Sequence, residues 1–181
     1  MTKKVTFVIP GNPFGKQRPL VVKTSYRGGR GIKRKETIAY ENKARYYWRN
    51  AYKGDYDLEN PVSLILTAYY QIPDSWPKWK KEAARQGLIR PMKKSSIKPD
   101  VDNVTKMIMD SLNQTSINRK HVPNTGLYKD DGQVVDQEIH AFYSDEPRVE
   151  VDAYILEKPD LKSLKIQMGE SLKAKKLTNK K

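Results

Sequence analysis

The sequence predicts an α+β domain, and the apolar pattern of three segments carries that prediction. Residues 149–155 alternate apolar and polar side chains, as a strand with one buried face does. Residues 62–72 are rich in side chains that favour strands, whereas residues 101–112 place apolar side chains at helical spacing. Because a strand with one apolar face must bury that face, we expect helices and strands to share one core.

The composition indicates a protein that binds a polyanion. The 181 residues include 35 Lys and Arg against 21 Asp and Glu, a net charge of +14. This length suits one domain with an appendage. No apolar run reaches the roughly 18 residues of a membrane-spanning helix, and the stretch from Val5 to Ile9 is too short for a signal peptide. We therefore expect no membrane partner.

The residue types present restrict the catalytic chemistry. The chain contains no cysteine, which excludes disulfides, zinc–thiolate sites and cysteine nucleophiles and suits a reducing cytoplasm. Only His121 and His140 are available, too little material for a histidine-rich metal site or a Ser-His-Asp arrangement. Carboxylates must therefore carry any catalytic chemistry.

The N-terminal segment is predicted to be a strand followed by a basic loop. The strand runs from Lys4 to Ile9 and ends at turn residues that begin with Pro10. No acidic residue precedes Glu36, and glycines are interleaved with the basic residues, so we expect this loop to order on a phosphate backbone. A solvated loop without that role is the alternative. The candidate DNA-binding residues are Lys16, Arg18, Lys23, Arg27, Arg30, Lys33, Arg34 and Lys35.

A long helix is predicted from Glu36 to about Gly54. Its apolar stripe recurs at the spacing that lines one helix face and consists of Tyr40, Ala44, Tyr47 and Ala51. The strand of residues 62–72 follows, and Pro73 ends it.

A short basic helix is predicted to begin near Pro77 and to end at Gly87. Ser75 is its expected cap. Trp76 and Trp79 are expected to anchor the helix to the body, because tryptophan is usually needed for packing in a chain with few large apolar residues.

Asp100 and Asp102 follow a basic linker that ends at Lys98, a further candidate DNA-binding residue. Pro99 biases the preceding residue away from helix, so we expect an extended segment with both carboxylates on one face. Two residues span about 6.5 Å along a strand, close enough for both carboxylates to reach one cation. Such a cluster repels phosphate unless a cation lies in it, and Mg2+ takes carboxylate oxygens as ligands. The pattern therefore favours a metal site inside a nucleic-acid-binding surface.

Lys106 lies one helical turn after Asp102, where it can contact a scissile phosphate or stabilise charge during cleavage. Asp110 follows one turn later and can pair with Lys106. An N-capped amphipathic helix with an ordinary ion pair is the alternative, with Asp102 as the cap. The core stripe of this helix is Val101, Val104, Met107 or Ile108, and Leu112.

A second acidic stretch follows a polar loop over residues 114–127. Asp130, Asp131 and Gly132 favour a turn by themselves, so a site role for Asp131 requires the fold to bring it to Asp100 and Asp102. A strand is predicted from Val134 to Phe142. The lysine-rich end is predicted to be a weakly amphipathic helix or solvated disorder.

The two acidic stretches together resemble those of the RusA family of Holliday junction resolvases. The first is Asp100-Val101-Asp102-Asn103 with Lys106, and the second is Lys-Asp-Asp-Gly-Gln-Val-Val-Asp at residues 129–136. The start of the chain, Ile9-Pro10-Gly11-Asn12-Pro13 with Lys16, Arg18 and Pro19, is similar to that of phage-borne members. The resemblance covers roughly residues 5–156.

The resemblance implies a homodimeric, Mg2+-dependent endonuclease that cuts four-way DNA junctions by paired nicks, with Mn2+ as a substitute metal. It places metal ligands at Asp100, Asp102 and Asp131, with Asp130 as the neighbouring acidic position and Lys106 as the active-site lysine. It also implies a small mixed β-sheet packed with α-helices, within an endonuclease domain over residues 1–157. Residues 158–181 form a basic C-terminal tail. Such a protein acts in the cytoplasm of a bacterial or phage-infected bacterial cell, in DNA recombination and repair.

The sequence departs from that family in the length of the 114–127 loop and of the basic segment after Lys16. Neither departure removes a proposed metal ligand. Two other functions stay open: a noncatalytic module that binds branched DNA, and a metal-dependent nuclease that acts on forks or flaps.

Overall fold

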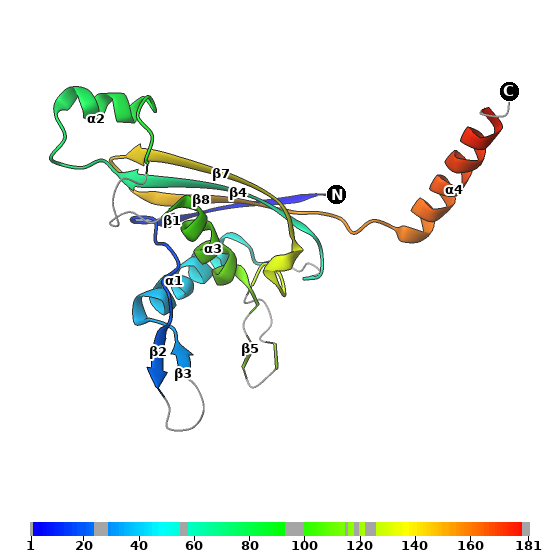
Figure 1. Cartoon of the computed structure of the whole chain (residues 1–181), viewed down its shortest axis with the longest axis horizontal. Coiled ribbons are helices and arrows are strands. Elements are labelled where there is room, and N and C mark those ends of the chain that lie inside the picture. Colours follow the sequence, from blue (N-terminus) through cyan, green and yellow to red (C-terminus); the bar gives the residue numbers. More distant parts are fainter. Residues whose placement is uncertain are drawn as a thin grey trace.

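The computed structural model describes residues 2–23, 29–54, 58–92, 100–114, 116–117, 120–121 and 126–178. Its body is a mixed four-stranded sheet with helices packed on it (Figure 1). This is the α+β fold that the sequence predicts. In the described part of the chain, no helix is long and apolar enough to cross a membrane.

The sheet has the strand order β1-β8-β4-β7. β8 runs antiparallel to both of its neighbours, whereas β4 and β7 run parallel. A parallel pair needs a crossover connection, and here the crossover carries both acidic stretches. The strands extend over β1 (Lys3–Pro10), β4 (Val62–Gln71), β7 (Val134–Ser144) and β8 (Arg148–Ile155), which confirms the four predicted strands.

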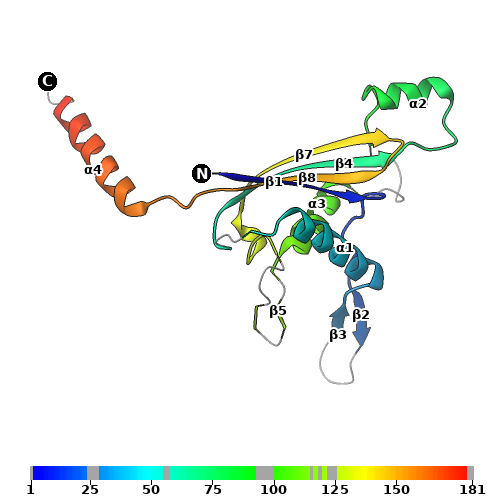
Figure 2. The same cartoon turned by 180° about the vertical axis from the view of Figure 1, so that it is seen from behind.

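Two helices, α1 (Lys35–Ala51) and α3 (Val101–Leu112), cover one face of this sheet. They lie on the same side of it in Figures 1 and 2, and they also pack on each other. Alternate strand residues supply the buried surface beneath them, because successive side chains of a strand point to opposite faces. These buried residues include Val62, Leu64, Leu66, Ala68 and Tyr70 of β4, and Val149, Val151, Ala153 and Ile155 of β8.

The buried stripe of α1 differs from the predicted one in its second half. Tyr40 is buried as predicted, but the next large core residue is Trp48, which is 2% exposed and packs edge-on against Phe7. Tyr47 is only half-buried and Ala51 is exposed. A stripe can continue at i+3 or i+4, and here the sheet selects the later position.

The short helix α2 (Lys78–Arg85) lies beyond the end of β7, away from α1 and α3 (Figure 1). Its N-cap is Pro77 and no side chain caps it, so the predicted Ser75 cap is wrong. Trp76 packs edge-on against a tyrosine of β7, with ring centroids 4.9 Å apart, as an anchor should. Trp79 is 70% exposed, so the second predicted anchor is wrong.

Three further parts of the chain project from the body in Figures 1 and 2. The segment predicted as a basic loop contains a hairpin of β2 (Leu20–Lys23) and β3 (Gly29–Ile32). The lysine-rich end forms the helix α4 (Leu161–Thr178). Of the two predicted alternatives, a weakly amphipathic helix and solvated disorder, the structure shows the helix. The 114–127 loop contains a small pair of strands, β5 (Ser116–Ile117) and β6 (Lys120–His121).

Candidate functional site

Asp100 and Asp102 occupy the N-terminal end of α3. Asp100 is the N-cap residue, with extended backbone and no side-chain cap hydrogen bond, and Asp102 lies in the first helical turn. The predictions of an extended Asp100–Asp102 segment and of Asp102 as N-cap are therefore wrong, because the helix begins at Val101. Both carboxylates still lie where the positive end of the helix dipole stabilises negative charge.

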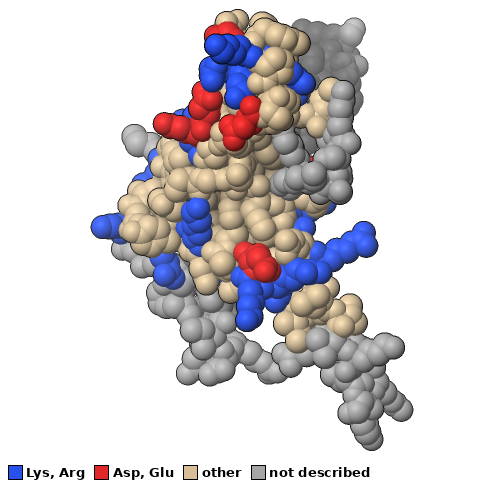
Figure 3. Space-filling model, turned by 90° about the vertical axis from the view of Figure 1, so that its left-hand side faces the viewer, with Lys and Arg blue, Asp and Glu red and all other residues tan. Residues whose placement is uncertain are grey.

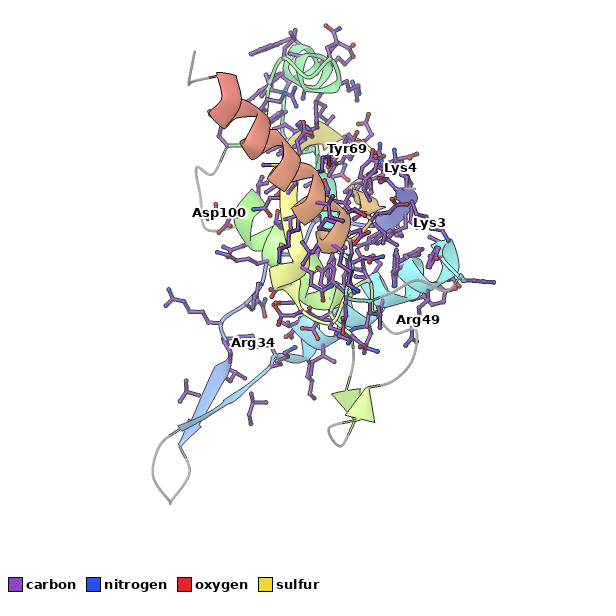
Figure 4. All side chains as sticks on the ribbon, turned by 90° about the vertical axis from the view of Figure 1, so that its right-hand side faces the viewer. Lys3, Lys4, Arg34, Arg49, Tyr69 and Asp100 are labelled. Carbon is purple, nitrogen blue, oxygen red and sulfur yellow. The ribbon has the colours of Figure 1, made fainter. Side chains whose placement is uncertain are left out.

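Asp100 lies near the C-terminal end of β4. Burial raises the pKa of Tyr70 to about 12, and the negative charge of Asp100 contributes to that rise. Figure 4 shows Asp100 at one end of α3, on the side of the molecule opposite to Lys3, Lys4 and Arg49. The first acidic stretch therefore begins on one side of the domain, opposite to these three basic residues.

The central contact of the site is an ion pair between Asp102 and Lys106. The two side chains meet at 2.7 Å, one helical turn apart, and are 70% and 57% exposed. The site role predicted for Lys106 requires it to share a helix face with Asp102, and this contact meets that requirement. Because both groups are open to solvent, the pair contributes little to stability and is available to a ligand.

Asp110 continues the same face by one more turn, but its partner is not the predicted Lys106. Its carboxylate meets the ammonium of Lys16 at 2.5 Å. The main-chain N–H of Lys16 also donates to the carbonyl of Asn103, at 3.0 Å. The segment that contains Lys16 thus lies along α3, a contact that the sequence analysis missed.

The second acidic stretch forms a short 3-10 helix, η1 (Asp131–Gln133). The carboxylate of Asp130 accepts from the N–H of Gly132 at 2.8 Å, and the Gln133 side chain accepts from the N–H of Asp130. Gln133 also donates to the carbonyls of Leu58 and Asn60. The local turn is therefore present as predicted, and its capping interactions fix it beside the start of β4.

η1 packs against α3, and Tyr128, three residues before η1, also contacts this helix. The Tyr128 hydroxyl donates to the carbonyl of Met109 at 2.9 Å. Burial raises the pKa of Tyr128 well above its ordinary value, and the charges of Asp131, Asp110 and Asp130 raise it further. The second acidic stretch therefore lies within electrostatic range of the half of α3 that carries Asp110.

In the described residues, no group of three Asp, Glu or His side chains lies close enough together to hold one metal ion. The structure pairs Asp102 with Lys106, and it places Asp110, Asp130 and Asp131 where the charge of each acts on Tyr128. The convergence of Asp131 with Asp100 and Asp102 stays a prediction. The sequence predicts Asp110 only as a partner for Lys106, although its spacing of two turns from Asp102 puts it on the site face.

Apart from Lys16, which lies along α3, the candidate DNA-binding residues that the structure describes lie in the hairpin or around its base. Lys33 pairs with Glu41 at 2.7 Å, and Arg34 donates to the carbonyl of Arg18 at 3.3 Å. Arg34 is on the same side of the molecule as Asp100 in Figure 4, and Figure 3 shows basic side chains gathered in the lower part of the face that it presents. Lys16, Arg18, Lys33, Arg34 and Lys35 are exposed, and Lys23 and Arg30 belong to the hairpin strands. Arg27 and Lys98 lie outside the described residues.

The chain is similar in sequence to known proteins over most of its length. The sequence model of a family described as "Endodeoxyribonuclease RusA" matches residues 10–154. That span includes both acidic stretches, Lys106 and the basic hairpin. A protein of Bacillus subtilis (strain 168) named "Uncharacterized protein YqaN" is 34% identical over 155 residues, which cover 81% of this chain and 93% of that protein.

Proposed function

Because the chain belongs to the RusA family of endodeoxyribonucleases, we propose that it resolves four-way DNA junctions by hydrolysing phosphodiester bonds at the site on α3. One observation on this structure supports the proposal in particular. The Asp102–Lys106 ion pair stands exposed on α3, in a domain whose basic hairpin lies on the same side as Asp100. Carboxylates can hold a metal ion that activates water, and a lysine beside them can stabilise the charge that develops on a phosphate during hydrolysis.

The donor chemistry of the site fits Mg2+. Asp100, Asp102, Asp130 and Asp131 offer only carboxylate oxygens, the ligand type that Mg2+ prefers, and Mn2+ accepts the same ligands. These four residues are the ones that would hold the ion, for which three or more of their side chains must approach one another more closely than they do in the structure. When bound, the ion supplies an activated water and stabilises the leaving oxygen of the cleaved bond.

The residues of the chain divide the remaining work. The contact with Asp102 places the Lys106 ammonium at the proposed metal site. There its positive charge can interact with a non-bridging oxygen of the phosphate. The lysines and arginines around the hairpin bind the phosphates of the DNA arms without selecting a sequence. In hydrolysis, an oxygen of water bonds to phosphorus while the bond from phosphorus to one sugar oxygen breaks.

Cleavage of a junction requires two such sites. A twofold homodimer presents two equivalent sites to a junction that itself has approximate twofold symmetry. We therefore include a homodimer in the proposal. Paired cutting follows from that symmetry rather than from two different catalytic centres in one chain.

A substrate comparison tests this proposal against its two rivals. Purified protein with Mg2+ is expected to nick a four-way junction much faster than a replication fork, a flap or a linear duplex of the same sequence. The measurement is the initial rate of each substrate at equal DNA concentration. Preferred cutting of forks or flaps would favour the other nuclease function, and binding without any cutting would favour a noncatalytic module.

A further inference from the structure

Lys16 stands apart from the other basic residues of the N-terminal segment, because the chain holds it against α3. Its main-chain N–H donates to the carbonyl of Asn103 at 3.0 Å, and its ammonium meets Asp110 at 2.5 Å. Phe14, two residues earlier, stacks on Tyr40 of α1 with ring centroids 5.3 Å apart. These contacts fix both the backbone and the side chain of Lys16 at the site face.

The position of Lys16 complements that of Lys106. Asp102, Lys106 and Asp110 follow one another at single helical turns, so Asp102 and Asp110 lie about 12 Å apart along the axis. Lys106 pairs with Asp102 at one end of this face, and Lys16 pairs with Asp110 at the other. The site therefore holds two exposed ammonium groups, each kept in place by an aspartate of α3.

We propose that Lys16 binds a DNA phosphate at the cleavage site itself and that Asp110 is the residue that positions it; this inference rests on the proposed function. Lys16 is 47% exposed and Asp110 is 22% exposed, so the lysine side of the pair is open to solvent and a phosphate can compete there for the ammonium. The ammonium then needs only to turn about its flexible stem. The tether to Asn103 keeps the rest of the residue in place.

The rival account makes Lys16 one more contact to the phosphate backbone, far from the bond that breaks. The two accounts differ in the step that they affect. A backbone contact contributes to junction binding and to its salt dependence. A residue at the cleavage site contributes to the rate after the junction is bound.

The test compares wild type with Lys16→Ala, Lys16→Arg and a matched control, Lys4→Ala. Lys4 is paired with Asp152 at 2.9 Å, is 49% exposed, and lies on the opposite side from Asp100 in Figure 4. Junction Kd is measured without divalent metal, and the single-turnover cleavage rate is measured in Mg2+ at saturating protein. Thermal unfolding checks that each variant is folded.

Lys16→Ala is expected to lower the saturating cleavage rate about 100-fold, the size of losing one charge-stabilising group. Its Kd is expected to rise by no more than about 5-fold, the value of one exposed ionic contact. Lys16→Arg keeps the charge and is expected to stay within about tenfold of the wild-type rate. Lys4→Ala is expected to change neither quantity.

A double-mutant cycle tests the positioning role of Asp110. Asp110→Asn is expected to lower the saturating rate about tenfold, and the Lys16→Ala/Asp110→Asn double variant is expected to be no slower than Lys16→Ala alone. A merely structural role for Asp110 would instead make the two losses multiply.

Each failure has its own signature. If wild type cleaves and Lys16→Ala reaches the wild-type rate once bound, Lys16 is an ordinary backbone contact and this inference is overturned while the proposed function stands. If wild type itself cuts no DNA in Mg2+ or Mn2+, the proposed function fails, and the inference fails with it.

Discussion

Asp102→Asn is expected to abolish junction cleavage in Mg2+, with a loss of about 1,000-fold or more, and to leave junction binding intact. The amide removes a negative ligand from the proposed ion and the partner of Lys106 at once. Its shape is nearly unchanged, and the Asp102 side chain is 70% exposed, so folding should not be affected. The cleavage rate and the junction Kd of the purified variant check both parts.

Asp145→Asn is the matched control for Asp102→Asn. Asp145 is also an exposed aspartate bonded to a cation at 2.7 Å, but its partner is Arg85 of α2. The control is expected to cleave like wild type. Normal cleavage by Asp102→Asn, with the control unaffected, would show that the site on α3 is not the catalytic centre.

Lys106→Met is expected to lower the saturating cleavage rate about 100-fold while the protein still binds the junction. Methionine keeps the unbranched stem of the side chain but lacks the terminal ammonium whose charge is offered to the phosphate. The loss of one exposed ion pair costs the fold little, because Lys106 is 57% exposed. Single-turnover rates and thermal unfolding measure the two effects separately.

Lys78→Met is a suitable control for Lys106→Met, because Lys78 is an exposed lysine at the start of a helix remote from α3. Its cleavage rate should match that of wild type. A wild-type rate for Lys106→Met would show that Lys106 has no role in cleavage and only forms an ordinary helix ion pair, the alternative that the sequence left open.

The strands were predictable because their pattern is simple. β8 alternates buried and half-buried residues along its whole length, and only one register buries the apolar set. The stripe of α1 was harder, because Tyr47 and Trp48 both continue a stripe that passes through Tyr40 and Ala44. The packing of Trp48 against Phe7 of β1 decides between them, and that contact is tertiary.

The site on α3 was predictable only in part, for a similar reason. Spacing alone permits Lys106 to pair with Asp102 or with Asp110. An i,i+4 ion pair stabilises a helix more when the acidic residue precedes the lysine, which favours the pair with Asp102. Asp110 is instead paired with Lys16. Lys16 approaches α3 through the fold of the N-terminal segment, and no local pattern in the sequence records that contact.

The placement of the second acidic stretch also depended on the fold. Asp130, Asp131 and Gly132 form the turn that their residue types favour. The hydrogen bonds of Gln133 to the loop before β4, and the packing of Tyr128 on α3, are what bring that turn to the helix. Both contacts join segments that are distant in sequence.

The most direct test of junction resolution is to map the nicks that the purified protein makes on a four-way junction with labelled strands, with and without Mg2+. We expect Mg2+-dependent nicks at symmetry-related positions on two opposing strands and none without the metal. Nicking that persists in a metal chelator, or cuts scattered over all four strands, would contradict it.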